Sequence, residues 1–292
     1  MKYRSMTRRT ALKSAVGTAL AAGGLTWGSA MPVAAAAGGG GTFRDVRAFH
    51  GTWEGVCDGR RARLRIVVAQ EAPGMPHTVY LTFTDLERDM TYIGSRQEVP
   101  SGARDIGTVT LSGAAALTWP SLLVHTCDTD ILSGIGSSGG GGSGYPMAFH
   151  RSATAPALTQ NRPFRDFEDW CGRPLGRGRY LGSLDGRKAQ LDVDVTMAGA
   201  ERRMVFHLTD LDRGADWYSH VLESEVRGWG PGRQRNPLAG VRMRPYWEGQ
   251  EPLRIGCLYW HGRNAAYVTG EGVGRGDRFG MTFVRRTPLN TP

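Results

Sequence analysis

A short phrase occurs twice in this chain, about 125 positions apart. It reads LTFTDLERD at residues 81–89 and FHLTDLDRG at residues 206–214. A second phrase recurs in the same order: GVCDGRRARLRI at 55–66 returns as GSLDGRKAQLDV at 182–193. Repeats in solenoid proteins are only roughly 20–50 residues long. The longer period here predicts a duplicated domain, with each copy large enough to bury its own core.

Both copies show the residue pattern of β-strands. RARLRIVV at 61–68 and KAQLDVDV at 188–195 alternate apolar and polar residues over part of their length, which places one face of a strand inward. Asp-Gly occurs at 58–59 and again at 185–186, where it fits a tight hairpin turn. Each copy contains about eight such strands, and closing them into a barrel removes exposed edges. We therefore expect an all-β protein of two tandem, antiparallel, eight-stranded up-and-down barrels, with β-sandwiches as the alternative.

Changes in composition divide the chain into five segments. The stretch SATAPALTQNRP between the copies is polar, contains proline and lacks periodicity, as expected of a linker. The expected segments are an export signal, a glycine-rich linker, the first barrel, a second linker and the second barrel, at 1–37, 38–42, 43–151, 152–163 and 164–292.

The first segment has the three parts of an export signal: a basic start, a mildly apolar middle and a small-residue end. Its TRRTALK stretch at 7–13 contains the pair Arg8 and Arg9 followed by Leu12 and Lys13. This stretch resembles the twin-arginine (Tat) signal, which implies passage through the Tat translocase and a secreted or extracellular protein. Glycine and threonine dilute the apolar middle, so we expect cleavage and no stable membrane anchor.

The net charge of the chain without the export signal does not indicate a particular partner. The net charge of the whole chain is +9, but five basic residues and no acidic residue lie within residues 1–37. The remaining chain therefore carries only +4. A charge this small does not predict a nucleic acid partner.

Four cysteines follow the signal, at Cys57, Cys127, Cys171 and Cys257. Export makes disulfides permissible, and four cysteines allow three connectivities. We favour Cys57 with Cys127 and Cys171 with Cys257, one bond within each copy. The alternative is four free thiols.

The opening of each copy, GTWEGVCDGRRARLRI or GRYLGSLDGRKAQLDV, is followed late in the copy by YPMAFHR or FGMTFVR. Together these segments resemble a small β repeat of exported bacterial proteins, a resemblance that implies no particular activity. The early GTW and the strand number are also similar to the calycin barrels, the avidins and lipocalins. That similarity implies a small ligand inside an eight-stranded barrel. The second copy has Arg179-Tyr180 in place of the expected tryptophan.

Motifs for catalysis and metal binding are incomplete. GSSGG at 136–140 fits the nucleophile motif G-x-S-x-G, but it lies in the glycine-rich run 133–144 and not between a strand and a helix. DTDILSG at 128–134 begins like a calcium loop, yet Leu132 and Gly139 occupy positions that need oxygen ligands. The seven histidines show no metal-ligand spacing. We expect no cofactor and no metal.

The candidate binding residues fall into two groups. The long loop ESEVRGWGPGRQRNP carries Trp229 flanked by three arginines, Arg227, Arg233 and Arg235. An exposed tryptophan among arginines can stack on a sugar ring or contact an anionic polymer, although this indole could instead fold back over the barrel end. The second group occupies corresponding positions in the two copies and comprises Asp85, Asp210, His125 and His261. We expect these residues to hold turns and barrel rims, with ligand contact at a barrel mouth as the alternative.

Taken together, these features predict an exported, non-enzymatic binding or cell-surface interaction protein. Carbohydrate, as a polysaccharide or cell-wall polymer, is the ligand class that the aromatic and arginine-rich loop favours. One alternative is a secreted hydrolase with a carboxylate or histidine at a barrel mouth. Another is a carrier of a small apolar ligand.

Overall fold

The computed structural model describes the chain beyond its first 40 residues in eight stretches, 41–138, 144–151, 164, 168–171, 176–226, 229, 231–274 and 277–287. The expected export signal and the expected linker at 152–163 lie outside these described residues. Within them, no helix is long and apolar enough to cross a membrane.

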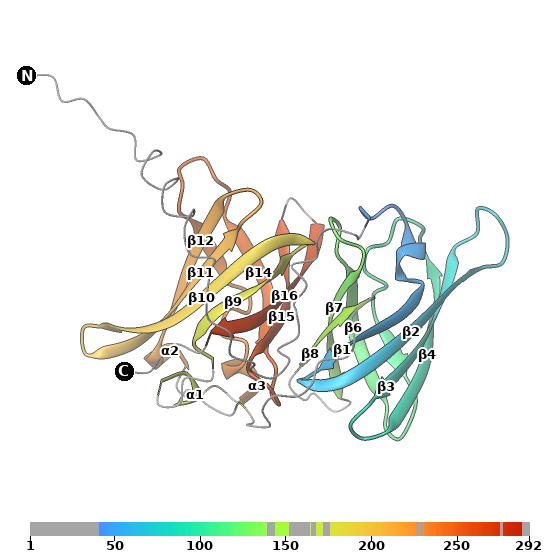
Figure 1. Ribbon diagram of the computed structural model, residues 1–292, viewed down its shortest axis with the longest axis horizontal. Coiled ribbons are helices and arrows are strands. Elements are labelled where there is room, and N and C mark those ends of the chain that lie inside the picture. Colours follow the sequence, from blue (N-terminus) through green and yellow to red (C-terminus); the bar gives the residue numbers. More distant parts are fainter. Residues whose placement is uncertain are drawn as a thin grey trace, which may run out of the picture. The chain divides into compact units, whose positions relative to one another are not determined.

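The first copy forms an eight-stranded antiparallel sheet that is nearly closed into a barrel (Figure 1). A short 3-10 helix, η1 (Val46–Phe49), precedes β1 (Gly51–Cys57), β2 (Arg60–Gln70), β3 (His77–Asp85), β4 (Met90–Val99), β5 (Val109–Leu111), β6 (Leu117–Val124), β7 (Ile131–Ser138) and β8 (Tyr145–His150). The strand order is β4-β3-β2-β1-β8-β7-β6-β5. Two backbone hydrogen bonds between Ile93 and Ser112 join β4 to the end of β5.

The second copy forms a closed barrel in the order β10-β11-β12-β13-β14-β15-β16-β9. Its strands are β9 (Gly178–Leu184), β10 (Arg187–Ala198), β11 (Glu201–Asp210), β12 (Ala215–Leu222), β13 (Arg242–Pro245), β14 (Leu253–Trp260), β15 (Tyr267–Gly274) and β16 (Asp277–Thr287). The helices of this copy are single turns, α1 (Glu168–Cys171), α2 (Glu223–Val226) and α3 (Pro231–Gln234). The expected fold of two eight-stranded antiparallel up-and-down barrels is confirmed, and the sandwich alternative is not.

The two Asp-Gly pairs form the turns that begin each barrel. Asp58 and Gly59 have φ angles of 49° and 85°, and Asp185 and Gly186 have φ angles of 54° and 88°. The strand register leaves only these two residues in each turn. Positive φ at both positions is the type I′ geometry, whose twist matches that of the flanking strands. Both hairpin turns were therefore predictable from the dipeptide alone.

Alternating side chains build the two cores. Ala62, Leu64 and Ile66 of β2 are buried, which confirms the period-two pattern of the sequence. Large aromatic side chains fill each barrel and are fully buried; they include Trp53, Trp119 and Phe149 in the first, and Trp170, Tyr180, Phe206 and Trp260 in the second. The protein's own aromatic side chains thus occupy the interiors of both barrels.

One segment differs from expectation. The glycine- and serine-rich run 133–144 has the composition of a flexible loop, but its first part lies in β7. Ser133 pairs with Leu123 of β6 and with Ala148 of β8. Backbone hydrogen bonds do not depend on side-chain type, so two flanking strands can hold a segment whose own strand propensity is low.

Candidate functional site

Residues of β11 and β12 that point away from the core form the floor of the candidate site. In β11, residues 204, 206, 208 and 210 are buried, so the residues between them face outward. The register places His207 opposite Tyr218 and Thr209 opposite Asp216. Cross-strand partners on one face lie close enough to interact directly.

A row of four aromatic rings crosses this outer face; we call it the aromatic strip, and it consists of His207, Tyr218, Tyr246 and Trp247. The His207 and Tyr218 rings are stacked, with centroids 4.4 Å apart and planes inclined by 6°. Tyr218 lies 5.3 Å from Tyr246, which lies 4.7 Å from Trp247. The outer two rings are open to solvent, because Tyr246 is 57% and Trp247 54% exposed.

The carboxylate of Asp216 contacts two members of the strip, His207 and Trp247. Its Oδ1 accepts a hydrogen bond from Thr209 Oγ1 at 2.7 Å and lies 2.8 Å from Nε2 of His207. Its Oδ2 accepts the indole N–H of Trp247 at 3.2 Å. Burial acts to raise the pKa of Asp216, but hydrogen bonds from Thr209, His207 and Trp247 outweigh it, so the pKa lies below its ordinary value. The carboxylate is therefore ionised at neutral pH.

The turn that carries Tyr246 and Trp247 is anchored to β12. Gln250 Nε2 donates to the Asp216 carbonyl at 2.9 Å, and the Asp216 N–H donates to Gln250 Oε1 at 3.2 Å. The Tyr246 N–H also donates to the Asp216 carbonyl at 2.9 Å. The rings are thus held in place before any ligand arrives, which lowers the entropy cost of binding.

A groove of about 370 Å³ continues from the strip along β11, β12 and β13. It exists because β13 pairs with β12 at only two positions, Trp217 with Pro245 and Tyr218 with Arg244. The residues that line it are Arg203, Val205, Tyr218, Ser219, His220, Arg242 and Arg244. Tyr218 belongs to both strip and groove, so the two form one surface.

The loop that the sequence singled out has a different geometry. Trp229 is half-buried and packs against the core of the second barrel, as the alternative interpretation of this loop describes. Arg233 lies over its ring at 4.6 Å. Arg235 is buried and places Nη1 2.8 Å from Asp58 Oδ1, so it does not flank an exposed indole. Arg227 lies outside the described residues.

Asp85 and Asp210 organise turns, as expected. Asp85 is buried and accepts the Arg60 Nε–H at 2.8 Å and the backbone N–H groups of Glu87 and Arg88. Asp210, also buried, accepts the Arg187 Nε–H at 2.7 Å and the backbone N–H of Arg213 at 3.1 Å. The repeated phrase thus encodes the same carboxylate–arginine contact in both barrels.

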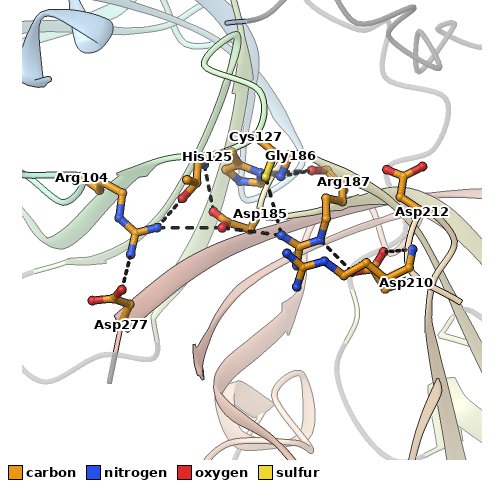
Figure 2. Close-up of polar contacts among 12 residues, drawn as sticks. Arg104, His125, Cys127, Asp185, Gly186, Arg187, Asp210, Asp212 and Asp277 are labelled. Atoms are coloured by element: carbon orange, nitrogen blue, oxygen red, sulfur yellow. Dashed lines mark hydrogen bonds and ion pairs between the residues drawn. The ribbon is translucent and has the colours of Figure 1, made fainter. Parts of the chain in front are cut away.

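The two Asp-Gly turns also make equivalent contacts with the opposite copy. Asp185 accepts the Thr126 N–H at 2.9 Å through Oδ1 and the Cys127 N–H at 3.0 Å through its carbonyl (Figure 2). In the same way, Asp58 accepts the N–H of Gly262 at 2.7 Å through Oδ1 and that of Arg263 at 3.1 Å through its carbonyl. Each copy therefore places its first turn against the same loop of the other.

His125 and His261 lie beneath these loops and are fully buried. The Gly186 N–H donates to Nδ1 of His125 at 3.0 Å, so this nitrogen is the acceptor and Nε2 carries the proton beside Ser133 Oγ. Burial, with smaller contributions from His150 and Arg187, lowers the pKa of His125 to about 3. Burial, together with Arg235, lowers the pKa of His261 well below its ordinary value. Both rings are uncharged parts of the interface.

The expected disulfide within the first copy is not formed. Cys57 is a free thiol buried in the core of the first barrel, whereas Cys127 is a free, exposed thiol in a loop. Cys257 is also a free thiol, and the side chain of Cys171 lies outside the described residues. Burial raises the pKa of the Cys257 thiol to about 12, so this thiol is un-ionised at neutral pH.

Across the described stretches, no group of three or more histidine, cysteine or acidic side chains is placed to hold a metal ion. The sequence matches no known family model. A comparison with curated proteins likewise finds no match.

Sequence reasoning missed the aromatic strip. Its members come from two strands and a turn. His207 lies within the repeated phrase, but its counterpart in the first copy is Thr82, so the repeat does not mark it. The one local indication is the RPYWEG stretch, where Tyr246 and Trp247 stand beside glycine and charged residues. That composition is typical of an exposed turn and not of a buried strand.

Proposed function

We propose that this protein is an exported binding protein that recognises polysaccharide through the aromatic strip. The observation that carries the proposal is the pair of exposed rings, Tyr246 and Trp247, held in a row with Tyr218 and His207 around an ionised carboxylate. Rigid aromatic rings supply contact area at low entropy cost, and the apolar face of a sugar ring can stack on them. The carboxylate of Asp216 can accept hydrogen bonds from sugar hydroxyl groups.

Export is part of the proposal and rests on the Arg8-Arg9 stretch at the N-terminus. A polysaccharide or cell-wall polymer is a ligand that an exported protein would meet outside the cell. Detection of the chain only inside the producing cells, with residues 1–37 still attached, would contradict this part of the proposal.

The binding proposal is tested by calorimetric titration of residues 38–292 with a panel of soluble polysaccharides. Replacement of Trp247 by Ala should weaken binding roughly tenfold, equal to about 1.4 kcal/mol, because it removes one of the two exposed rings of the strip and the indole N–H that Asp216 accepts. The control is Tyr80→Ala, which removes an exposed ring of similar accessibility (51%) from the first barrel.

Equal losses in both variants would show that binding does not use the strip. A Trp229→Phe variant separates this site from the neighbouring loop. Binding that survives Trp247→Ala but fails in Trp229→Phe would move the site to that loop.

A further inference from the structure

The groove beside the aromatic strip is strongly basic. Three arginines, Arg203, Arg242 and Arg244, line it together with His220. They come from the outward-facing positions of β11, β12 and β13, so the register of these strands concentrates positive charge along one face of the second barrel.

These arginines are not used to hold the fold. Among the residues that the structure describes, Arg203, Arg242 and Arg244 form no ion pair. Other arginines of the same barrel do: Arg179, for example, lies 2.9 Å from Asp192. An arginine without a protein carboxylate is free to bind a ligand anion.

Two further features favour an anion in the groove. Nε of Arg203 is buried and has no hydrogen-bond partner among the described residues, which carries a free-energy cost for a polar group. Arg242 lies directly opposite Arg254 in the β13–β14 register, and both are exposed. Like charges at such a position destabilise a sheet, and a bound anion would offset both costs.

We infer that the polysaccharide bound by this protein is anionic, with sugar rings on the aromatic strip and carboxylate or phosphate groups in the arginine groove. This inference rests on the proposed function. The planar guanidinium group pairs with both kinds of anion through two parallel hydrogen bonds. Tyr218, shared by strip and groove, places the charged substituent next to a stacked ring.

A nucleic acid fits this surface less well. Asp216 is an ionised carboxylate in the middle of the strip, where hydroxyl groups can donate hydrogen bonds to it. Each sugar of a polysaccharide offers several hydroxyl groups, whereas a nucleotide within an RNA chain offers only its ribose 2′-hydroxyl.

The experiment titrates residues 38–292 with four soluble polymers: neutral dextran, dextran phosphate, polygalacturonate and a single-stranded RNA. We expect at least one anionic polysaccharide to bind at least tenfold more tightly than dextran. Polygalacturonate and dextran phosphate distinguish carboxylate from phosphate as the recognised group.

The paired substitution Arg242→Gln and Arg244→Gln should remove this preference, reducing affinity for the anionic polymer at least tenfold more than affinity for dextran. The matched control is Arg65→Gln with Arg96→Gln, two exposed arginines of the first barrel, which changes net charge equally. Trp247→Ala should weaken binding of both polymers.

The outcomes separate the two claims. Equal affinity for dextran and the anionic polymers would overturn the inference and leave the proposed function standing. Tighter binding of RNA than of any polysaccharide would overturn the inference as well, as would equal losses in the groove variant and its control. Binding of none of the four polymers would overturn both claims.

Discussion

Two buried histidines show how burial changes the protonation of a side chain. His125 and His261 occupy corresponding positions in the two copies, and both are uncharged because they are buried. His125 has its Nδ1 satisfied by the Gly186 N–H, whereas Nδ1 of His261 is buried without a partner. The side chain that approaches His125 from the other copy is Ser183, and the corresponding residue of the first copy is Val56, which cannot hydrogen-bond.

The buried histidines should make the protein less stable in acid. The pKa of His125 falls from 6.5 to about 3 on folding, so below pH 6.5 the unfolded chain binds a proton that the folded chain does not. Between pH 7.5 and 5.5 this costs about 1.4 kcal/mol. The lowered pKa of His261 acts in the same direction. Denaturant titrations at the two pH values measure this loss of folding stability.

A His125→Asn variant isolates the contribution of the His125 ring to this pH-dependent loss of stability. We expect its loss of stability between the two pH values to be smaller than that of the wild type by about 1.4 kcal/mol. A buried apolar residue provides the control, because Leu132→Ala removes no titratable group and should lower stability equally at both pH values. A variant that loses as much stability as the wild type would show that His125 is not a neutral, buried group.

At the scale of elements, the tight turns have two roles. Each Asp-Gly turn joins the first two strands of its barrel. It also accepts backbone hydrogen bonds from a loop of the opposite copy. A Cβ atom added at Gly186 would lie 2.3 Å from the Asp128 nitrogen and 2.7 Å from the Cys127 carbonyl carbon. Both are backbone atoms, which cannot turn aside as a flexible side chain can.

Gly186→Ala should therefore destabilise the protein more than an ordinary turn substitution. The matched control is Gly199→Ala, where φ is also positive, at 65°, but no atom lies within 4 Å of the added Cβ. The control carries only the left-handed backbone cost of about 1–2 kcal/mol. We expect Gly186→Ala to lose at least 1 kcal/mol more, measured by guanidinium denaturation. Equal losses would mean that this turn does not pack closely against the loop.

At the scale of the whole molecule, the two copies are joined by polar and apolar contacts. Arg235 of the second barrel is bonded to Asp58 of the first, 177 positions away in the chain. Val56 and Ala148 of the first barrel form a small buried cluster with Tyr267 of the second. Contacts of this kind couple the stability of the two copies.

We expect the barrels to unfold in a single calorimetric transition. Replacing Asp58 and Asp185 by Asn keeps an acceptor for the loop N–H groups but removes the charge that faces Arg235 and Arg104. The double variant should broaden or divide the transition and reduce the ratio of van't Hoff to calorimetric enthalpy. An Asp194→Asn control breaks an ion pair within one barrel and should lower the transition temperature without dividing it.

The local features of this protein follow from short stretches of its sequence. The alternation in β2 and β10 and the Asp-Gly turns follow from the geometry of a few consecutive residues, so the all-β fold, the duplication and the barrel architecture could be predicted. The roles of Asp85 and Asp210 in their turns were equally local. Residues outside the repeated segments, such as Tyr218, Tyr246 and Trp247, have no local pattern that predicts their role.

The position of the candidate site depends on contacts between residues that are distant in the chain. Asp216 meets His207 through strand register and Trp247 through a turn more than 30 positions away in the chain, and neither contact leaves a local pattern. Trp229 and Arg235 looked available for binding, yet one covers a core and the other bonds to the opposite barrel. Burial and long-range pairing depend on how strands close and how copies meet, and a single sequence does not display these distances.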